Sequence, residues 1–134
     1  MKVIVDTSVW SLALRRDKDD SPAPVQELRH IIRDHRAQMM GPIRQEILSG
    51  IRSKSQFKKL RKHLESFPDL PILTEDYVTA AQFFNHCRSK GIQGSNTDFL
   101  ICAVAVKNKL SIYTTDKDFE IFSSYIQIVL HKAN

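Results

Sequence analysis

Residues 1–10 read MKVIVDTSVW, a short apolar run that ends on an acid. Residues Lys2 to Val5 have the composition of a buried strand, which runs directly into a carboxylate, Asp6. A charge at the end of a core strand is costly to bury without a partner. Asp6 could simply N-cap a helix that begins near Ser8. Alternatively, it could lie at the carboxyl end of a parallel strand, where open α/β sheets bind their ligands.

The composition is that of a globular domain of ordinary size. Hydrophobic residues make up 42% and charged residues 26% of the 134 residues. The longest apolar run, Phe99 to Val106, is too short to span a bilayer, and Asp6 interrupts the N-terminal apolar run too early for a signal peptide. Cys87 and Cys102 fall in helical patterns, where buried free thiols are usual. We therefore expect a cytoplasmic protein with no membrane segment, folded as a single domain over residues 1–134.

Positive charge is concentrated in one part of the chain. The formal net charge of the whole sequence is +5. Between Pro42 and His63 there are seven basic residues and one acid, Glu46, which gives this segment a net charge of +6. The basic residues are Arg44, Arg52, Lys54, Lys58, Lys59, Arg61 and Lys62. Charge localised in this way suits a polyanion such as a nucleic acid, although a solvated helix face would have the same composition.

Short β-type runs alternate with helical patterns along the chain. The runs are Val3–Val5, Gln38–Met40, Ser111–Tyr113 and Ile126–Leu130, with a weaker one at Ile72–Leu73. Separate helical patterns begin at Val9, Val25 and Ile43. Two further helices are predicted by apolar stripes, one formed by Phe57, Leu60, Leu64 and Phe67 and the other by Tyr77, Ala81, Phe84 and Cys87. The apolar run from Phe99 to Val106 follows them. The first helix ends in the polar stretch RDKDDSPAP, residues 16–24. This alternation predicts an α/β three-layer sandwich, with a mainly parallel sheet and helices on both faces.

Four acids occupy positions that such a fold would bring to one edge of its sheet. Asp6 and Asp116 each follow a predicted strand. Glu46 lies in the helix after residues 38–40, and Asp98 lies in the first turn of the most apolar helix. Because the carboxyl ends of parallel strands open on the same edge, these carboxylates would repel one another. A bound cation would sustain such a cluster, and hard oxygen ligands favour Mg²⁺ or Mn²⁺.

Taken singly, each acid also has an ordinary structural explanation. The helix dipole favours Asp98 near a helix N-terminus, with Asn96 as the cap. Asp116 and Asp118 could be first-turn acids of the helix that follows, and Glu46 could be a helix-surface residue. The chain contains no phosphate-binding glycine loop, no nucleophile elbow and no zinc-ligand spacing. Metal-assisted attack on phosphorus is the chemistry that remains.

Four motifs, in order, resemble those of PIN-domain ribonucleases, and more narrowly of the VapC-type toxins of bacterial type II toxin–antitoxin pairs. They are VDTSVW (5–10), QEILSG (45–50), TDFLICAVAV (97–106) and YTTDKDF (113–119), and they extend over nearly the whole chain. The resemblance implies an acidic quartet around the metal, formed by Asp6, Glu46, Asp98 and Asp116. It also implies supporting roles for Asp118, Thr7, Ser8 and Thr115. We expect the RNA backbone to bind Arg44, Arg52, Lys54, Lys58, Lys59 and Lys62.

The resemblance further implies a Mg²⁺-dependent endoribonuclease, with Mn²⁺ as a substitute, that leaves a 5′-phosphate and a 3′-hydroxyl. It implies a homodimer and a cognate antitoxin that presents an Arg or Lys to the quartet. Apolar residues near the site are candidates for these interfaces where the core does not bury them: Trp10, Leu12, Leu14, Ile47, Leu48 and Ile51. A PIN nuclease of RNA processing without an antitoxin, and a non-catalytic PIN binding module, are alternatives. A phospho-accepting receiver domain is disfavoured, because only one acid follows the first strand.

Overall fold

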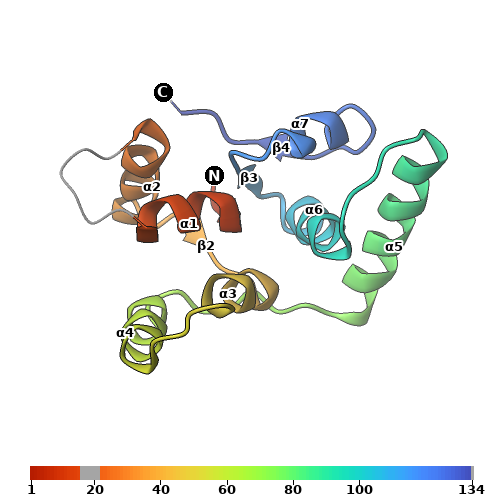
Figure 1. Ribbon diagram of the computed structural model, residues 1–134. Helices are drawn as coiled ribbons and strands as arrows, with labels where there is room; N and C mark the ends of the chain where they lie inside the picture. The colour runs from red at the N-terminus through yellow and green to blue at the C-terminus, as the bar shows by residue number, and fades with distance from the viewer. Residues whose placement is uncertain (16–21, 134) are drawn as a thin grey trace.

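Short strands are separated by one, two or four helices along the chain (Figure 1). The computed structural model describes residues 1–15 and 22–133. Its strands are β1 (Val3–Val5), β2 (Ala37–Gln38), β3 (Ser111–Tyr113) and β4 (Val129–Leu130). Its helices are α1 (Thr7–Arg15), α2 (Ala23–Arg33), α3 (Gly41–Leu48), α4 (Lys54–Leu64), α5 (Thr74–Ser89), α6 (Asn96–Asn108) and α7 (Asp118–Phe122). Most of the polar stretch predicted to end the first helix, residues 16–21, lies outside the described residues.

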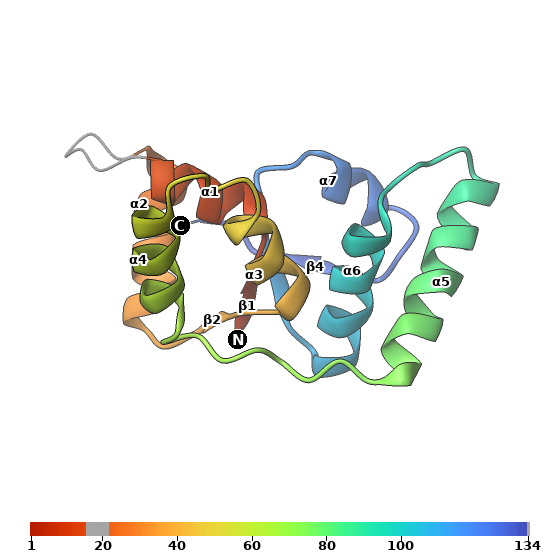
Figure 2. The ribbon, with the colours of Figure 1, turned by 60° about the horizontal axis from the view of Figure 1, so that its bottom comes forward.

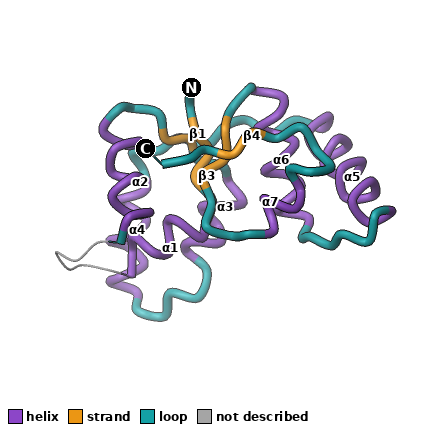
Figure 3. Tube along the Cα trace, turned by 90° about the horizontal axis from the view of Figure 1, so that it is seen from above, coloured by secondary structure: helices purple, strands orange, loops and turns teal. Residues whose placement is uncertain are grey.

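The strands form one sheet in the order β2-β1-β3-β4, and every pair of neighbours is parallel. Helices α1, α2 and α4 gather at one end of the molecule and α5, α6 and α7 at the other, with the strands between them (Figures 2 and 3). The predicted α/β fold with a parallel central sheet is therefore confirmed. In β1 and β3 the register pairs Val5 with Tyr113, so the two strands end side by side. The residues that follow the two strands, Asp6 and Thr114, therefore lie at the same edge of the sheet.

The core is built around β1 and α6. All three residues of β1 are fully buried, and α6 is buried from Phe99 to Ala105. This explains why the sequence of α6 is apolar on every side instead of on one face. No helix within the described residues is long and apolar enough to cross a membrane.

Three of the predicted strands differ from those observed. β2 comprises Ala37–Gln38, and Met39 forms only an isolated bridge with Asp69. The run Ile126–Leu130 supplies a strand only at Val129–Leu130. Residues 72 and 73 form no strand; they lead into α5. Short apolar runs are ambiguous by periodicity, and here the sheet uses only the residues that reach a neighbouring strand.

Two predicted apolar stripes are also partly wrong. Tyr77 is 56% exposed, and α5 instead buries Asp76, Ala80 and Cys87 against the molecule. Phe57, at the start of the α4 stripe, is 37% exposed, whereas Leu64 at the other end of the helix is fully buried. In the first half of α5 the buried positions therefore lie one residue before the predicted ones, and the buried acid Asp76 pairs with Lys107 of α6.

Candidate active site

Asp6 follows β1 directly and is only 7% exposed. Its backbone N–H donates to the carbonyl of Tyr113 at 2.9 Å, which fixes the residue at the carboxyl end of both central strands. Its own carbonyl accepts from Val9 and Trp10 in the first turn of α1. Its carboxylate accepts from two hydroxyls, Ser8 Oγ and Thr114 Oγ1, each at 2.8 Å from Oδ2. The backbone of Asp6 thus starts the helix, and the side chain is held by hydroxyls.

The two hydroxyls that hold Asp6 are themselves fixed by backbone donors. The N–H of Thr115 donates to Ser8 Oγ at 3.1 Å, and the N–H of Asp116 donates to Thr114 Oγ1 at 2.9 Å. Each hydroxyl therefore accepts from the loop after β3 and donates to Asp6, which leaves its proton little freedom. This network ties the loop that carries Asp116 to the end of β1.

Thr114 is the residue that sequence reasoning missed. We expected a supporting hydroxyl at Thr115, whose side chain is exposed and which contributes its backbone N–H to the network. Because Tyr113 pairs with Val5, the residue after Tyr113 lies opposite Asp6. An alignment of the two strand ends, with Val5 against Tyr113, could have identified Thr114 from the sequence.

Glu46 reaches the same edge from α3. The helix begins at Gly41, with Pro42 in its first turn, where a missing backbone N–H costs nothing. The hydroxyl of Thr7, the residue after Asp6, donates to Glu46 Oε1 at 2.6 Å. The side chain of Glu46 is otherwise exposed. α3 therefore presents a carboxylate beside Asp6 that is held by one short hydrogen bond.

Asp98 lies at the third position of α6, in a capping box with Ser95. The Asp98 N–H donates to Ser95 Oγ at 3.1 Å, and the Ser95 N–H donates to Asp98 Oδ2 at 3.2 Å. The cap is thus Ser95 and not Asn96, which was our expectation. Burial raises the pKa of Asp98, hydrogen bonds from Ser95 lower it, and the charges of Asp6 and Asp116 raise it further. The net pKa is above the usual value for an aspartate, so three carboxylates influence one another at this edge.

Asp116 and Asp118 lie where β3 turns into α7. The N–H of Asp118 donates to Asp116 Oδ1 at 2.9 Å, which orients the Asp116 carboxylate. Asp118 begins α7 and is exposed, whereas Asp116 is half-buried. Asp116 is linked to Asp6 through Thr114 Oγ1, and its charge acts on Asp98, whereas Asp118 contributes a backbone N–H.

The site carries uncompensated negative charge. Among residues 1–15 and 22–133, no ion pair involves Asp6, Glu46, Asp98 or Asp116. In the same residues, no three His, Cys, Asp or Glu side chains are grouped closely enough to hold a metal ion. Mg²⁺ needs no such cage, because it keeps several of its waters and binds through one or two carboxylates. The donor set therefore fits a hydrated hard cation.

Neither cysteine offers a nucleophile. Cys102 lies one turn along α6 from Asp98 and is fully buried. Burial raises the pKa of its thiol well above the usual range, and the charge of Asp98 raises it further. Burial likewise raises the pKa of Cys87. Both remain thiols near neutral pH, so covalent thiolate chemistry has no support here.

Of the basic residues between Pro42 and His63, Arg44 is bound within the chain and the others are exposed. Arg44 pairs with Asp69 at 3.0 Å and donates to the carbonyls of Leu64 and Phe67, which ties α3 to the end of α4. Its charge is used within the chain. The exposed basic residues are Arg52, Lys54, Lys58, Lys59, Arg61 and Lys62.

A groove of about 1070 Å³ runs between α1, α3 and α4. Ala13, Leu14, Ile47, Ile51 and Leu60 give it apolar walls, and Lys59 and Lys62 line it on α4. Glu46 also lines the groove, so it leads to the acidic edge. Of the apolar residues expected near the site, Trp10 and Ile47 are 2% and 6% exposed and belong to the core, whereas Leu14 is 37% exposed.

Solved structures of other proteins share the fold of this chain. A search among curated proteins finds no significant match. Three solved structures are similar over nearly the whole of both chains. DNA-bound VapBC from Salmonella typhimurium has 18% identity and a TM-score of 0.77, covering 98% of this chain and 97% of that one. VapBC2 from Rickettsia felis, bound to a promoter DNA fragment, has 16% identity and a TM-score of 0.76, covering 100% of both. FitAcB from Neisseria gonorrhoeae has 19% identity and a TM-score of 0.75, covering 96% of both.

At these identities the similarity is one of fold, but a family model goes further. The model of the PIN domain matches residues 3–123, which include β1, the acidic edge and α7. The four motifs noted in the sequence all lie within this range. The chain belongs to the PIN-domain family.

Proposed function

We propose that this protein is a metal-dependent endoribonuclease and the toxin of a type II toxin–antitoxin pair. One observation carries the proposal: Asp6 and Asp116 follow neighbouring parallel strands, their charges help to raise the pKa of Asp98, and no basic side chain of the described residues pairs with the three acids. PIN domains are generally nucleases, which agrees with this arrangement. Similarity to VapBC structures agrees with the VapC-type motifs in the sequence.

One or two carboxylates of the quartet Asp6, Glu46, Asp98 and Asp116 would hold a hydrated Mg²⁺ or Mn²⁺ directly, and the others would bind the waters of the ion. When bound, the cation would help to generate hydroxide from water and would stabilise charge on the phosphoryl oxygens. Ser8 and Thr114 keep Asp6 in place, and Asp118 orients Asp116 through its backbone N–H. These hydrogen bonds thereby fix the carboxylates of Asp6 and Asp116 before a substrate arrives.

Glu46 is proposed to orient the attacking water. Its Oε1 accepts from Thr7, while the rest of the exposed carboxylate is open to solvent. The water oxygen forms a bond to phosphorus, the bond from phosphorus to the 3′ oxygen breaks, and a proton passes to that oxygen. The products are a 5′-phosphate and a 3′-hydroxyl.

Five of the six exposed basic residues of α4 and the segment before it are proposed to bind RNA phosphates. They are Arg52, Lys54, Lys58, Lys59 and Lys62. Arg44 leaves our expected RNA-binding set, because its guanidinium group is engaged with Asp69 and two carbonyls. Contacts of this kind hold the backbone and carry little base specificity.

A cognate antitoxin is proposed to occupy the groove between α1, α3 and α4. Apolar side chains line the groove, and Glu46 lies along it. A segment of antitoxin in the groove could place an Arg or Lys at the acidic edge, where a cation would replace the charge of the metal. The homodimer is proposed to form through α5 and the residue before it, because Leu73, Tyr77 and Val78 are each more than half exposed.

Induced expression in a bacterium tests the proposal, with the wild type, Asp6→Asn, and the wild type together with the adjacent small reading frame. We expect growth arrest by the wild type alone, since Asp6→Asn removes a ligand charge and the neighbour blocks the site. Purified wild type should cleave RNA with Mg²⁺ or Mn²⁺ and stop when EDTA is added.

The outcomes separate the parts of the proposal. Cleavage that survives EDTA, or products with a cyclic phosphate, would refute the metal mechanism. Harmless expression of a soluble wild type that cleaves RNA in vitro would refute the toxin assignment and favour RNA processing. Absence of RNA cleavage under all conditions would favour a non-catalytic binding module.

A further inference from the structure

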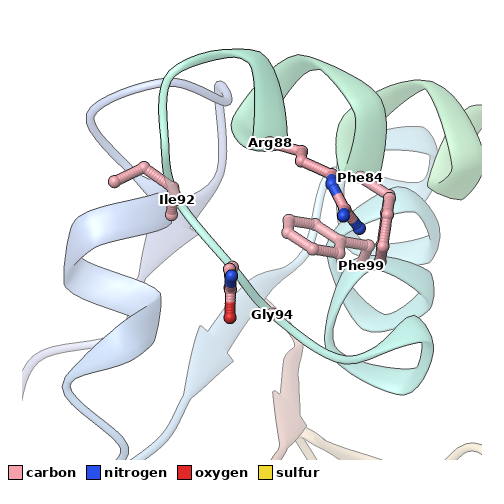
Figure 4. A pocket seen from close by; sticks show the side chains of 6 residues that line it. Phe84, Arg88, Ile92, Gly94 and Phe99 are labelled. Atoms are coloured by element: carbon pink, nitrogen blue, oxygen red, sulfur yellow. The ribbon is translucent and has the colours of Figure 1, made fainter.

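A small pocket lies beside the loop that leads to Asp98. It has a volume of about 160 Å³ and is lined by Phe84, Arg88, Ile92, Gln93, Gly94 and Phe99 (Figure 4). We call it the Arg88 pocket. None of its residues belongs to the acidic site, the basic helix or the groove described above.

The Arg88 pocket lies at the end of the α5–α6 pair that carries Asp98. α5 and α6 run in opposite directions, because Asp76 near the start of α5 pairs with Lys107 near the end of α6. At the other end of the pair, the rings of Phe84 and Phe99 pack edge to face, with centroids 5.6 Å apart. This is the end of α6 that carries Asp98. In Figure 2 the loop between α5 and α6 lies along the same border as α7 and the start of α1.

The wall of the pocket next to Asp98 is held rigidly. A Cβ atom on Gly94 would lie 2.6 Å from Phe122 Cζ and 2.9 Å from Phe99 Cε2, so only glycine fits there. The next residue, Ser95, caps α6 and bonds Asp98. A ligand in the pocket therefore lies against a backbone that is continuous with the acidic site.

The groups in the pocket are free to bind. Arg88 is exposed and forms no ion pair with any described residue. Figure 4 shows its guanidinium group beside the rings of Phe84 and Phe99. In the part of the chain that the structure describes, the backbone groups of Gln93 and Gly94 have no hydrogen-bond partner. The pocket thus offers a cation, the partly exposed ring of Phe84, and backbone donors and acceptors.

The size of the pocket limits its ligand. Pockets for drug-sized molecules measure about 300–1,000 Å³, and one water takes roughly 30 Å³. The observed 160 Å³ therefore suits one planar ring system of the size of a nucleobase. A lone phosphate would make no use of the aromatic ring, and an aliphatic side chain would make no use of the guanidinium group. A nucleotide uses both, since its base stacks on aromatic rings and on arginine while its phosphate pairs with arginine.

We propose that the Arg88 pocket is a subsite for one nucleotide of the RNA strand, with the base against Phe84 and Arg88 and the adjoining phosphate on Arg88. This inference rests on the proposed ribonuclease function and adds a position at which the enzyme holds a base near the scissile phosphate. The base is held by stacking and by the free backbone of Gln93 and Gly94. The subsite thereby sets which phosphate reaches the acids.

Fluorescent RNA tests the proposal directly. A single-stranded RNA of about 10 nucleotides carries one 2-aminopurine, moved along the strand position by position, and is titrated with wild-type protein in EDTA. We expect quenching at one position, and Arg88→Gln and Phe84→Leu should each abolish it. Arg88→Gln should also weaken binding about 10-fold, within the range for loss of one stacked base, and lower the salt slope by about 0.7 for one single-strand phosphate.

Two charge-matched variants serve as controls. Lys58→Gln, on the basic helix, should lower the salt slope but leave the position-specific quenching intact. Arg33→Gln, on the exposed end of α2, should change neither quantity. Because Arg88 is exposed, its variant should fold, and thermal melting checks this for Phe84→Leu.

The outcomes distinguish the subsite from the nuclease. RNA cleavage and binding by the wild type with uniform quenching along the strand, or with quenching unchanged in Arg88→Gln, would overturn the subsite and leave the nuclease standing. A wild type that neither binds nor cleaves RNA would overturn both. Quenching at one position that is lost in both pocket variants and kept in both controls would support the subsite.

Discussion

Two aspartates occupy equivalent positions in neighbouring helices and have opposite surroundings. Asp76 is the third residue of α5 and accepts from the N–H of Leu73 at 2.8 Å. Asp98 is the third residue of α6 and accepts from the N–H of Ser95 at 3.2 Å. Asp76 is 2% exposed and pairs with Lys107 at 3.3 Å. Asp98 has the carboxylates of Asp6 and Asp116 as its charged neighbours.

The comparison separates a structural acid from a functional one. Helix capping explains the position of both residues, since a carboxylate at a helix N-terminus satisfies a free N–H. Capping does not explain why one acid has a counter-charge and the other has two like charges. The missing counter-charge is the feature that suggests a cation at Asp98 and not at Asp76.

The largest expected difference between the two acids is in catalysis. Asp98→Asn keeps an oxygen for the Ser95 N–H but loses a negative charge toward the metal. RNA cleavage should therefore fall by at least about 100-fold, the upper end of the losses found when a residue that only orients a metal ligand is changed. Asp76→Asn should leave the cleavage rate per folded molecule unchanged. The measurement is the rate of RNA cleavage with saturating Mg²⁺.

Equal loss of activity in both variants, with both folded, would break the distinction between them. Full activity in Asp98→Asn would remove that residue from the site. Comparison of Asp116→Asn with Asp118→Asn extends the test, and we expect the smaller loss in Asp118→Asn because Asp118 is exposed.

The sequence was sufficient for the fold class, for β1 and β3, and for the acids at their ends. It succeeded there because strand ends and helix starts are local features. It failed for Asp76, which sequence reasoning passed over in favour of the exposed Tyr77. The burial of Asp76 depends on Lys107, which is 31 residues away in the chain, and no local pattern reports such a partner.

The same limit applies within the site. The role of Thr114 depends on the register between β1 and β3, and the engagement of Arg44 depends on the path of the chain after α4. Composition alone places Arg44 among residues free to bind RNA, because it cannot show which cations are paired. Tertiary pairing decides which charges remain free.

The second difference concerns folding stability. Asp76→Asn should lower the free energy of unfolding by about 1–2 kcal/mol, since it breaks a charge-assisted bond and leaves Lys107 without its partner. The expected loss in the free energy of unfolding is smaller than for a fully buried ion pair, because the side chain of Lys107 is 39% exposed. Urea denaturation measures it. Lys107→Gln should cost a similar amount, and no change in either variant would show that the pair contributes nothing.

The smallest effect, and the one of opposite sign, is expected for Asp98 in the absence of metal. The folded pKa of Asp98 is above its usual value, so the folded state holds this proton more tightly than the unfolded chain does. The ionised carboxylate therefore costs stability above the raised pKa, and the cost disappears as the pH falls through that pKa toward the usual value. Asp98→Asn should accordingly raise the Tm of the protein in EDTA at pH 7 and lose this advantage in acid.

Mg²⁺ should raise the Tm of the wild type more than that of Asp98→Asn, because ligand binding to the folded state stabilises it. Glu120→Gln, which removes one exposed charge from α7, should give a small change in Tm that Mg²⁺ does not alter. A lower Tm for Asp98→Asn in EDTA at neutral pH would show that the capping role of Asp98 outweighs the repulsion, and would erase the difference between the two aspartates.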